Sequence, residues 1–310
     1  MSDSRANELR IPLRHLILAA KAWGDPSDPP LLAVHGWLDN AGTFDRLAPL
    51  LPGHYLVALD LAGHGRSGHR PAASWYPYAD FLDEIGQVID WFGWASVDLL
   101  GHSLGAALVS TFAAICPDKV RRLLLVEGLG PLTQGAEKTL DQLRRSYAAR
   151  ASFDPGRLRV FSSLDEAIDA RCRSGHLSVH AARCIVERGV KRVGGSDGQR
   201  EQGANSGLEQ FQASAGFSWS SDAQLTIPSP TRLTEEQLAA VLPAIVASTL
   251  IVLAEPHAPY LQTTMVDARI ALLADIEVVR MAGTHHLHLE NPEPVAVAMR
   301  DFLTRHPLVA

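Results

Sequence analysis

The chain has 310 residues, of which 46% are hydrophobic and 20% are charged, and its formal net charge is -6. This composition excludes a chain that is disordered throughout and suits one large α/β core that carries an inserted smaller part. Because the charge lacks the basic excess that nucleic-acid binding requires, we expect a small neutral molecule as the partner and no nucleic acid.

Targeting and redox signals are weak in this sequence. The first residues lack the apolar region of a secretory signal, and no stretch reaches membrane-spanning length without charges. The three cysteines, Cys116, Cys172 and Cys184, are odd in number and form no C-x-x-C pair, so they predict neither a disulfide framework nor a zinc knuckle. We therefore expect an unexported protein of the cytoplasm, without a membrane span.

Residues 9–23 predict an antiparallel hairpin at the start of the chain. From residue 31 onward, short apolar runs alternate with amphipathic segments, which is typical of βα units that form a mainly parallel sheet. The expected buried strands are 31–36, 55–61, 97–103, 120–128, 249–255 and 276–283. Segments 78–93, 104–116 and 294–306 have the apolar spacing of helices, so we expect helices on both faces of the sheet.

Residues 131–228 interrupt this alternation, because amphipathic helical stretches occur where another strand would be expected. We interpret them as a helical cap inserted into a core formed by residues 1–130 and 229–310. Within the cap, residues 194–210 are rich in Gly, Ser and Gln and poor in apolar residues, so they predict a flexible loop.

The chemistry is first indicated by Gly101-His102-Ser103-Leu104-Gly105, a G-x-S-x-G motif between a predicted strand and a predicted helix. The glycines fit the sharp turn that presents a nucleophilic serine above a sheet, because side chains at their positions would collide with the backbone. We therefore predict that Ser103 is a nucleophile; a glycine-flanked structural turn is the alternative.

A second element of the predicted site is an oxyanion hole. His35-Gly36-Trp37 ends an earlier strand, where the backbone N–H of Trp37 can face a reacting carbonyl. The backbone N–H of Leu104, at the start of a helix, is the expected second donor. Trp37 can also form an apolar wall of the pocket with its side chain.

A serine nucleophile requires a general base, and Thr284-His285-His286-Leu287-His288 offers three histidines after the last predicted strand. Clustered histidines with a nearby glutamate also occur in zinc sites, but H-x-x-H alone lacks the H-E-x-x-H pattern. We expect neither a metal nor a cofactor.

Gly63-His64-Gly65-Arg66-Ser67-Gly68 satisfies the G-x-G-x-x-G pattern of dinucleotide-binding proteins. The residues that follow include two prolines and have no helical periodicity, so no helix N-terminus is predicted to hold a pyrophosphate. A structural loop is the better interpretation.

Four motifs, at 35–40, 60–67, 101–105 and 283–292, follow the order found in α/β-hydrolase fold enzymes, which the chain resembles. More narrowly, residues 21–24, 35–52 and the GTHHLHL segment resemble serine hydrolase-like proteins. The resemblance covers the chain from about residue 13 to its C-terminus and is weakest in the Gly/Ser/Gln-rich part of the cap. Serine at the elbow departs from haloalkane dehalogenases and epoxide hydrolases, which use a carboxylate nucleophile.

The resemblance implies that His285, five residues before Glu290, is the catalytic histidine, with His286 and His288 as neighbours. It also implies an acid on one of two strands. The later strand end offers Glu255 but no aspartate, whereas Glu127 lies 24 residues after Ser103, the spacing found in family members whose acid comes one strand earlier. We predict Glu127, with Glu255 and Asp60 as alternatives.

The predicted activity is that of a cofactor-free serine hydrolase, carboxylesterase-like, that cleaves a small ester or related acyl substrate through an acyl-enzyme. The same residues also suit a C–C hydrolase, a lyase or a perhydrolase, and a non-catalytic small-molecule receptor of this fold is a further alternative.

Overall fold

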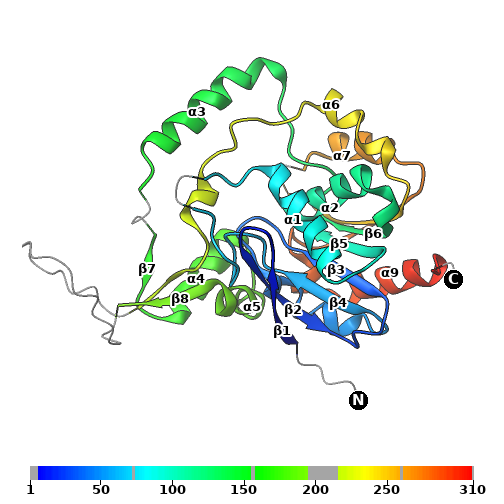
Figure 1. The fold of residues 1–310 in the computed structure, drawn as a ribbon, viewed down its shortest axis with the longest axis horizontal. Helices are drawn as coiled ribbons and strands as arrows, with labels where there is room; N and C mark the ends of the chain where they lie inside the picture. The colour runs from blue at the N-terminus through cyan, green and yellow to red at the C-terminus, as the bar shows by residue number, and fades with distance from the viewer. Residues whose placement is uncertain (1–5, 72–73, 155–157, 195–215, 259–260, 309–310) are drawn as a thin grey trace, which may run out of the picture.

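The computed structural model describes residues 6–71, 74–154, 158–194, 216–258 and 261–308, and its centre is an eight-stranded sheet (Figure 1). The strands follow the order β1-β2-β4-β3-β5-β6-β10-β11. Their bounds are β1 Asn7–Pro12, β2 Ile17–Trp23, β3 Pro30–Val34, β4 Tyr55–Leu59, β5 Val97–His102, β6 Val120–Val126, β10 Ser248–Glu255 and β11 Ile276–Ala282. Each predicted strand is confirmed within a few residues.

The sheet is parallel from β4 through β11, whereas β1 pairs with β2 and β2 pairs with β4 in antiparallel fashion. The predicted N-terminal hairpin is therefore confirmed. The parallel strands are buried apolar runs because helices cover both faces of the sheet.

Two apolar clusters lie on opposite faces of the sheet. Helices α1, Tyr78–Trp91, and α2, Leu104–Ile115, contribute to the first cluster, and α9, Pro292–Arg305, contributes to the second. These three helices agree with the sequence prediction. The remaining core helices are α6 Glu235–Ala239, α7 Thr263–Ile270, α8 Leu287–Glu290 and the 3-10 turns η1 Ala41–Phe44, η2 Ala48–Leu50, η3 Pro117–Lys119 and η7 Leu242–Ala244.

Most of the chain between β6 and β10, up to η6, forms a group of elements beside the main sheet (Figure 1). It contains α3 Thr139–Ala151, α4 Leu164–Gly175, α5 Val179–Gly189, η4 Ala136–Lys138, η6 Ala223–Thr226 and the strands β7 Val160–Phe161, β8 Val190–Val193 and β9 Gly216–Trp219. The helices were expected. The three-stranded antiparallel sheet β7-β9-β8 was not, because its strands are only two to four residues long and carry little periodicity.

A third apolar cluster joins α4, α5 and the three-stranded sheet of this group. It includes Phe161, Ile168, Ile185 and Val186, and it also includes Leu289 from the segment after β11. The predicted flexible loop 194–210 lies outside the described residues except for Gly194. Across the described ranges, no helix has the length and apolarity that crossing a membrane demands.

Candidate active site

Ser103 lies at the turn between β5 and α2, in a backbone conformation that is rare for residues other than glycine. Its φ is 54° and its ψ is -113°. Its N–H donates to the Val126 carbonyl at 2.9 Å, and its carbonyl accepts from Ala107 N–H at 3.0 Å, so the turn is held from both sides. Strained residues of this kind persist only where the surroundings determine them, and they cluster at functional sites.

The motif glycines make this turn possible. A Cβ on Gly101 would lie 2.5 Å from the backbone N of Ala106, and a Cβ on Gly105 would overlap the Val34 carbonyl. Gly128 is also closely packed, because a Cβ there would lie 2.9 Å from the carbonyl oxygen of Ser103. The ends of β3, β5 and β6 therefore pack around Ser103 with no room for side chains at these positions.

His285 and Glu127 form a hydrogen-bonded pair near this turn. His285 Nδ1 lies 3.1 Å from Glu127 Oε2, and the Glu127 side chain is fully buried. Glu127 Oε1 accepts from the Ala254 N–H at 2.6 Å, which fixes the carboxylate. The carbonyl oxygen of His285 lies 2.9 Å from His102 Nε2, so this histidine stands beside the residue that precedes Ser103.

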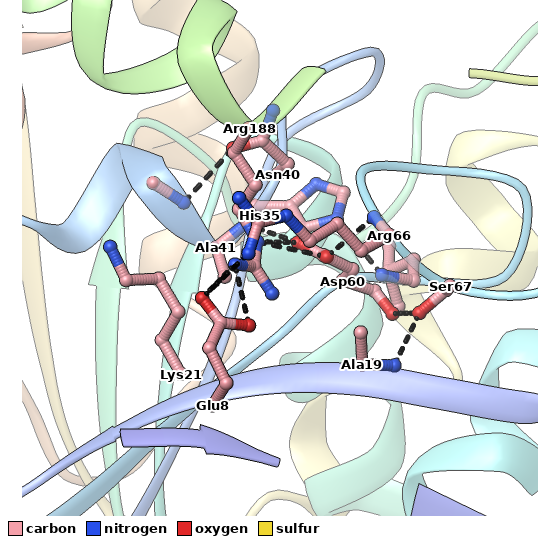
Figure 2. Close-up of polar contacts among 12 residues, drawn as sticks. Glu8, Ala19, Lys21, His35, Asn40, Ala41, Asp60, Arg66, Ser67 and Arg188 are labelled. Atoms are coloured by element: carbon pink, nitrogen blue, oxygen red, sulfur yellow. Dashed lines mark hydrogen bonds and ion pairs between the residues drawn. The ribbon is translucent and has the colours of Figure 1, made fainter. Parts of the chain in front are cut away.

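The two alternative acids lie in other surroundings. Glu255, at the end of β10, is exposed and lines a surface cavity of about 650 Å³ together with His257 and Arg280. Asp60 follows β4 and is fully buried, but both of its oxygens accept from Arg188 Nε at 2.9 Å (Figure 2). Of the three carboxylates, Glu127 is the one that hydrogen-bonds His285.

The peptide that joins Gly36 to Trp37 is oriented by hydrogen bonds. His35 Nδ1 lies 2.7 Å from the Gly36 carbonyl, which also accepts from the Asp39 N–H at 3.1 Å. Because the peptide is planar and trans, its N–H points away from its carbonyl. A Cβ on Gly36 would lie 3.2 Å from Ser103 Cβ, so this peptide lies directly against the serine side chain.

His35 is kept neutral in this arrangement. Its Nε2 accepts from the Leu61 N–H at 3.0 Å, so Nδ1 carries the proton that is donated to the Gly36 carbonyl. Burial lowers the pKa of His35 to about 4. Leu104, the second residue expected to contribute a backbone N–H, is the first residue of α2, where backbone N–H groups have no partner within the helix.

Three buried histidines, His102, His286 and His288, pack against one another beside Ser103 and His285. His286 Nε2 lies 3.1 Å from Asp39 Oδ2, and His288 Nε2 lies 3.0 Å from Thr43 Oγ1. Burial lowers the pKa of His102 and of His288 well below the usual value for histidine. Both side chains are thus neutral packing and hydrogen-bonding groups at neutral pH.

Among the described residues, Asp39, His102 and His286 offer ligand atoms that lie within 4.8 Å of one another. This trio differs from the H-x-x-H pair considered in the sequence. Asp39 already forms an ion pair with Arg171. Burial by itself would raise the pKa of Asp39, but Arg171 and then His286 outweigh burial and lower it. The carboxylate charge is therefore compensated by protein groups, which weakens the case for a cation here.

The loop at 63–68 does not lead into a helix. It consists of turns, and α1 begins only at Tyr78 in the described chain. A Cβ on Gly65 would overlap the Asp60 carboxylate, so this glycine serves close packing. The structural interpretation of the motif is supported.

Sequence reasoning missed the polar residues that support the site. Asp39 and Asn40 lie within a motif that the resemblance had marked, and their position directly after a strand could have drawn attention to them. Arg171 and Arg188 belong to the β6–β10 group and carry no local signal, because their partners lie 132 and 128 residues away.

The comparisons with known proteins agree with this architecture. Residues 29–164 match the family model of the alpha/beta hydrolase fold. A protein named "Probable serine hydrolase" from Drosophila melanogaster is 30% identical over 294 residues, covering 92% of this chain and 83% of that protein. The serine hydrolase-like protein of Danio rerio is 26% identical, covering 96% of this chain and 88% of that protein.

A solved structure is also similar over almost the whole chain. The crystal structure of a hypothetical protein from Pseudomonas aeruginosa PAO1 has a TM-score of 0.84 and 35% sequence identity, and the match covers 96% of this chain and 98% of that one. A thioesterase domain from the curacin biosynthetic pathway, 24% identical with a TM-score of 0.77, shares the fold. With its parallel sheet, its strained serine turn and these relatives, the chain belongs to the α/β-hydrolase fold family, as a hydrolase similar to the serine hydrolase-like proteins.

Proposed function

We propose that the protein is a serine hydrolase that cleaves a small carboxylic ester, or a related acyl substrate, through an acyl-enzyme on Ser103. The observation that carries this proposal is the 3.1 Å hydrogen bond between His285 Nδ1 and Glu127 Oε2 beside the strained Ser103 turn. A serine, a histidine and a buried carboxylate in this relation form the set that activates a hydroxyl nucleophile.

In the proposed reaction, Ser103 Oγ attacks the substrate carbonyl while His285 Nε2 takes its proton. Glu127 accepts the Nδ1 proton in a hydrogen bond, which sets the tautomer and stabilises the imidazolium that forms during attack. His285 then protonates the leaving alcohol, and the acyl group remains on Ser103. A water molecule, deprotonated by His285, releases the acid and restores the serine.

The negative charge on the tetrahedral oxygen would be held by the backbone N–H groups of Trp37 and Leu104. The Trp37 N–H suits this role because the Gly36 carbonyl is fixed in the opposite direction by His35 and Asp39. The Leu104 N–H lies at the helix N-terminus, where the dipole favours negative charge. Preorganised donors of this kind are typically worth about 10²–10³ in kcat each.

We further propose that residues 131–228 act as a cap over the core of residues 1–130 and 229–310, and that the cap sets substrate preference. Helices α4 and α5 and strands β7, β8 and β9 of this region share an apolar cluster, and Leu289, four residues after His285, belongs to it. This part of the cap is therefore packed against the segment that carries the proposed base. The three cysteines are all free, which supports a reducing compartment such as the cytoplasm.

The decisive experiment is labelling with a fluorophosphonate probe, combined with turnover of a panel of p-nitrophenyl esters. We expect the protein to be labelled on Ser103, Ser103→Ala to be neither labelled nor active, and Ser110→Ala to be labelled as wild type. Ser110, buried about two helix turns further along α2, is a matched control because its hydroxyl donates to the Ala107 carbonyl. Absence of both labelling and turnover in the wild type would overturn the proposal in favour of a receptor of the same fold.

A further inference from the structure

The loop that would supply the Trp37 oxyanion donor is strained, and its downstream end is held by the cap. Between β3 and η1, Leu38 has a φ of 60°. A residue other than glycine in the left-handed region is strained and persists only where its surroundings determine it. Together with the His35 hydrogen bond to the Gly36 carbonyl, the contacts that fix residues 37–42 therefore determine where the Trp37 N–H points.

Four of these contacts come from the cap. Trp37 Nε1 donates to the Leu225 carbonyl at 3.2 Å, and Asp39 forms its ion pair with Arg171 of α4. Asn40 Nδ2 donates to the Ile185 carbonyl of α5 at 2.8 Å. Next to it, a Cβ on Gly42 would overlap the carbonyl oxygen of Cys184, so the backbones of η1 and α5 are in direct contact.

The Asp60 carboxylate connects the same loop to a second residue of α5. Asp60 Oδ1 accepts from the Ala41 N–H at 2.8 Å, and Oδ2 accepts from the Arg66 N–H at 2.8 Å. Arg188 Nε approaches both oxygens at 2.9 Å (Figure 2). A buried carboxylate that lost its cationic partner would be left uncompensated, so its place between Ala41 and Arg66 depends on Arg188.

Arg188 is itself fixed from the core side. Its side chain is 5% exposed, and Nη1 donates to Glu8 Oε1 at 2.7 Å and to Glu8 Oε2 at 3.0 Å. Burial alone would lower the pKa of Arg188, but the carboxylates of Asp60 and Glu8 together raise it. The guanidinium is thus a permanently charged link from α5 to two parts of the core.

We propose that Arg188 is a positioning residue for residues 37–42, which we call the oxyanion loop. Arg188 acts on this loop through Asp60 and Ala41, and the Asn40 contact to Ile185 acts beside it. The position of the Trp37 N–H therefore depends on docking of the cap. This inference rests on the proposed function. It gives the cap a catalytic effect besides substrate preference, because displacing α5 would release the loop and weaken binding of the transition state rather than binding of the substrate.

The test compares Arg188→Lys and Asn40→Ser with Arg183→Ala. Lysine keeps the charge of Arg188 but lacks the planar fork, and serine keeps a capping oxygen for η1 but does not reach Ile185. Arg183 lies on the same helix, is 43% exposed and forms ion pairs of 3.4 Å with Asp165 and Glu187, so it controls for surface charge on α5. Folding is checked by far-UV circular dichroism.

We expect kcat for a p-nitrophenyl ester to fall by about 10- to 100-fold in Arg188→Lys and in Asn40→Ser, because a donor displaced by about 1 Å can cost about 10² in rate. KM should stay within about threefold, since these groups do not touch the ground-state substrate. A trifluoromethyl ketone forms a tetrahedral oxyanion on the serine, so its inhibition constant should increase by the same factor as kcat falls. Amide hydrogen exchange of peptide 36–44 should accelerate, and Arg183→Ala should match wild type in every measurement.

An unchanged kcat in Arg188→Lys, with or without faster exchange, would overturn the inference, as would a loss expressed only in KM. Failure of both variants to fold would also overturn it, since these contacts would then be general stabilisers. The proposed function is judged separately, from turnover of the wild type and of Ser103→Ala. An active wild type with unaffected Arg188 and Asn40 variants would therefore refute only this inference.

Discussion

His285 Nδ1 lies 3.1 Å from Glu127 Oε2, although 158 residues separate them in the chain. The parallel order of β6, β10 and β11 creates this contact: Glu127 follows β6, His285 follows β11, and the ends of neighbouring parallel strands meet at one edge of the sheet. Glu127 has a φ of 55° and is anchored to Ala254 on the next strand. The carboxylate is thereby turned toward the histidine.

The first prediction concerns the acid. Glu127→Gln should lower kcat for a p-nitrophenyl ester by roughly 10⁴, because the amide supports the wrong tautomer of His285. Glu255→Gln, at an exposed strand end, should keep most of the activity. Steady-state kinetics of the two variants decides the matter, and the reverse ranking would assign the acid to Glu255.

The second prediction concerns the base. Only neutral imidazole can accept the Ser103 proton, so kcat/KM should rise with pH between about 5 and 8. The measurement is the pH profile for an uncharged ester. A flat profile across this range would refute a histidine base.

The third prediction concerns stability at acidic pH. Burial lowers the pKa of His64 to about 3 and that of His35 to about 4. In the unfolded chain these groups bind protons near pH 6.5, whereas the folded state binds them only at lower pH. The free energy of unfolding should therefore fall as pH decreases from 6.5, by about 1.4 kcal/mol per unit for each such histidine.

Urea unfolding of wild type and His64→Gln at several pH values measures this effect. The variant should have a smaller slope between pH 6.5 and 4.5, because one buried neutral histidine is removed. Equal slopes would show that His64 does not contribute to the acid sensitivity.

The fourth prediction concerns the serine turn. Gly105→Ala should destabilise the fold by about 2 kcal/mol or more, because its Cβ would overlap the Val34 carbonyl. Gly86→Ala in α1 is the control: its Cβ would contact Phe112 at an ordinary 3.6 Å, and alanine favours a helix by roughly 0.5–1 kcal/mol. Thermal unfolding distinguishes the two, and an unaffected Gly105→Ala would contradict the close packing.

The fifth prediction concerns the cap. Replacing residues 131–228 with the corresponding segment of a serine hydrolase-like relative should change the ranking of acyl chain lengths but spare fluorophosphonate labelling of Ser103. The chimera should retain arginine at the position of Arg188. A folded chimera with an unaltered ranking would mean that preference is set by the core.

Local patterns in the sequence determined much of the fold. Apolar runs of strand length and amphipathic helical segments predicted the strands of the main sheet and helices α1, α2 and α9, because burial on both faces of a sheet imposes such patterns on short stretches. The Ser103 turn was predictable from its five-residue motif, because a sharp turn between a strand and a helix requires glycine at Gly101 and Gly105. The partner that excludes a side chain at Gly105, the Val34 carbonyl of β3, appears only in the tertiary structure.

Contacts between distant segments were decided only by the tertiary structure. Glu127 and Glu255 end neighbouring strands and look alike in sequence, yet one turns inward to His285 and the other faces solvent. Arg188 reads as an ordinary charged residue of an amphipathic helix until α5 docks beside Asp60. A carboxylate or guanidinium acquires its partner from the arrangement of elements in space, and no local periodicity encodes that arrangement.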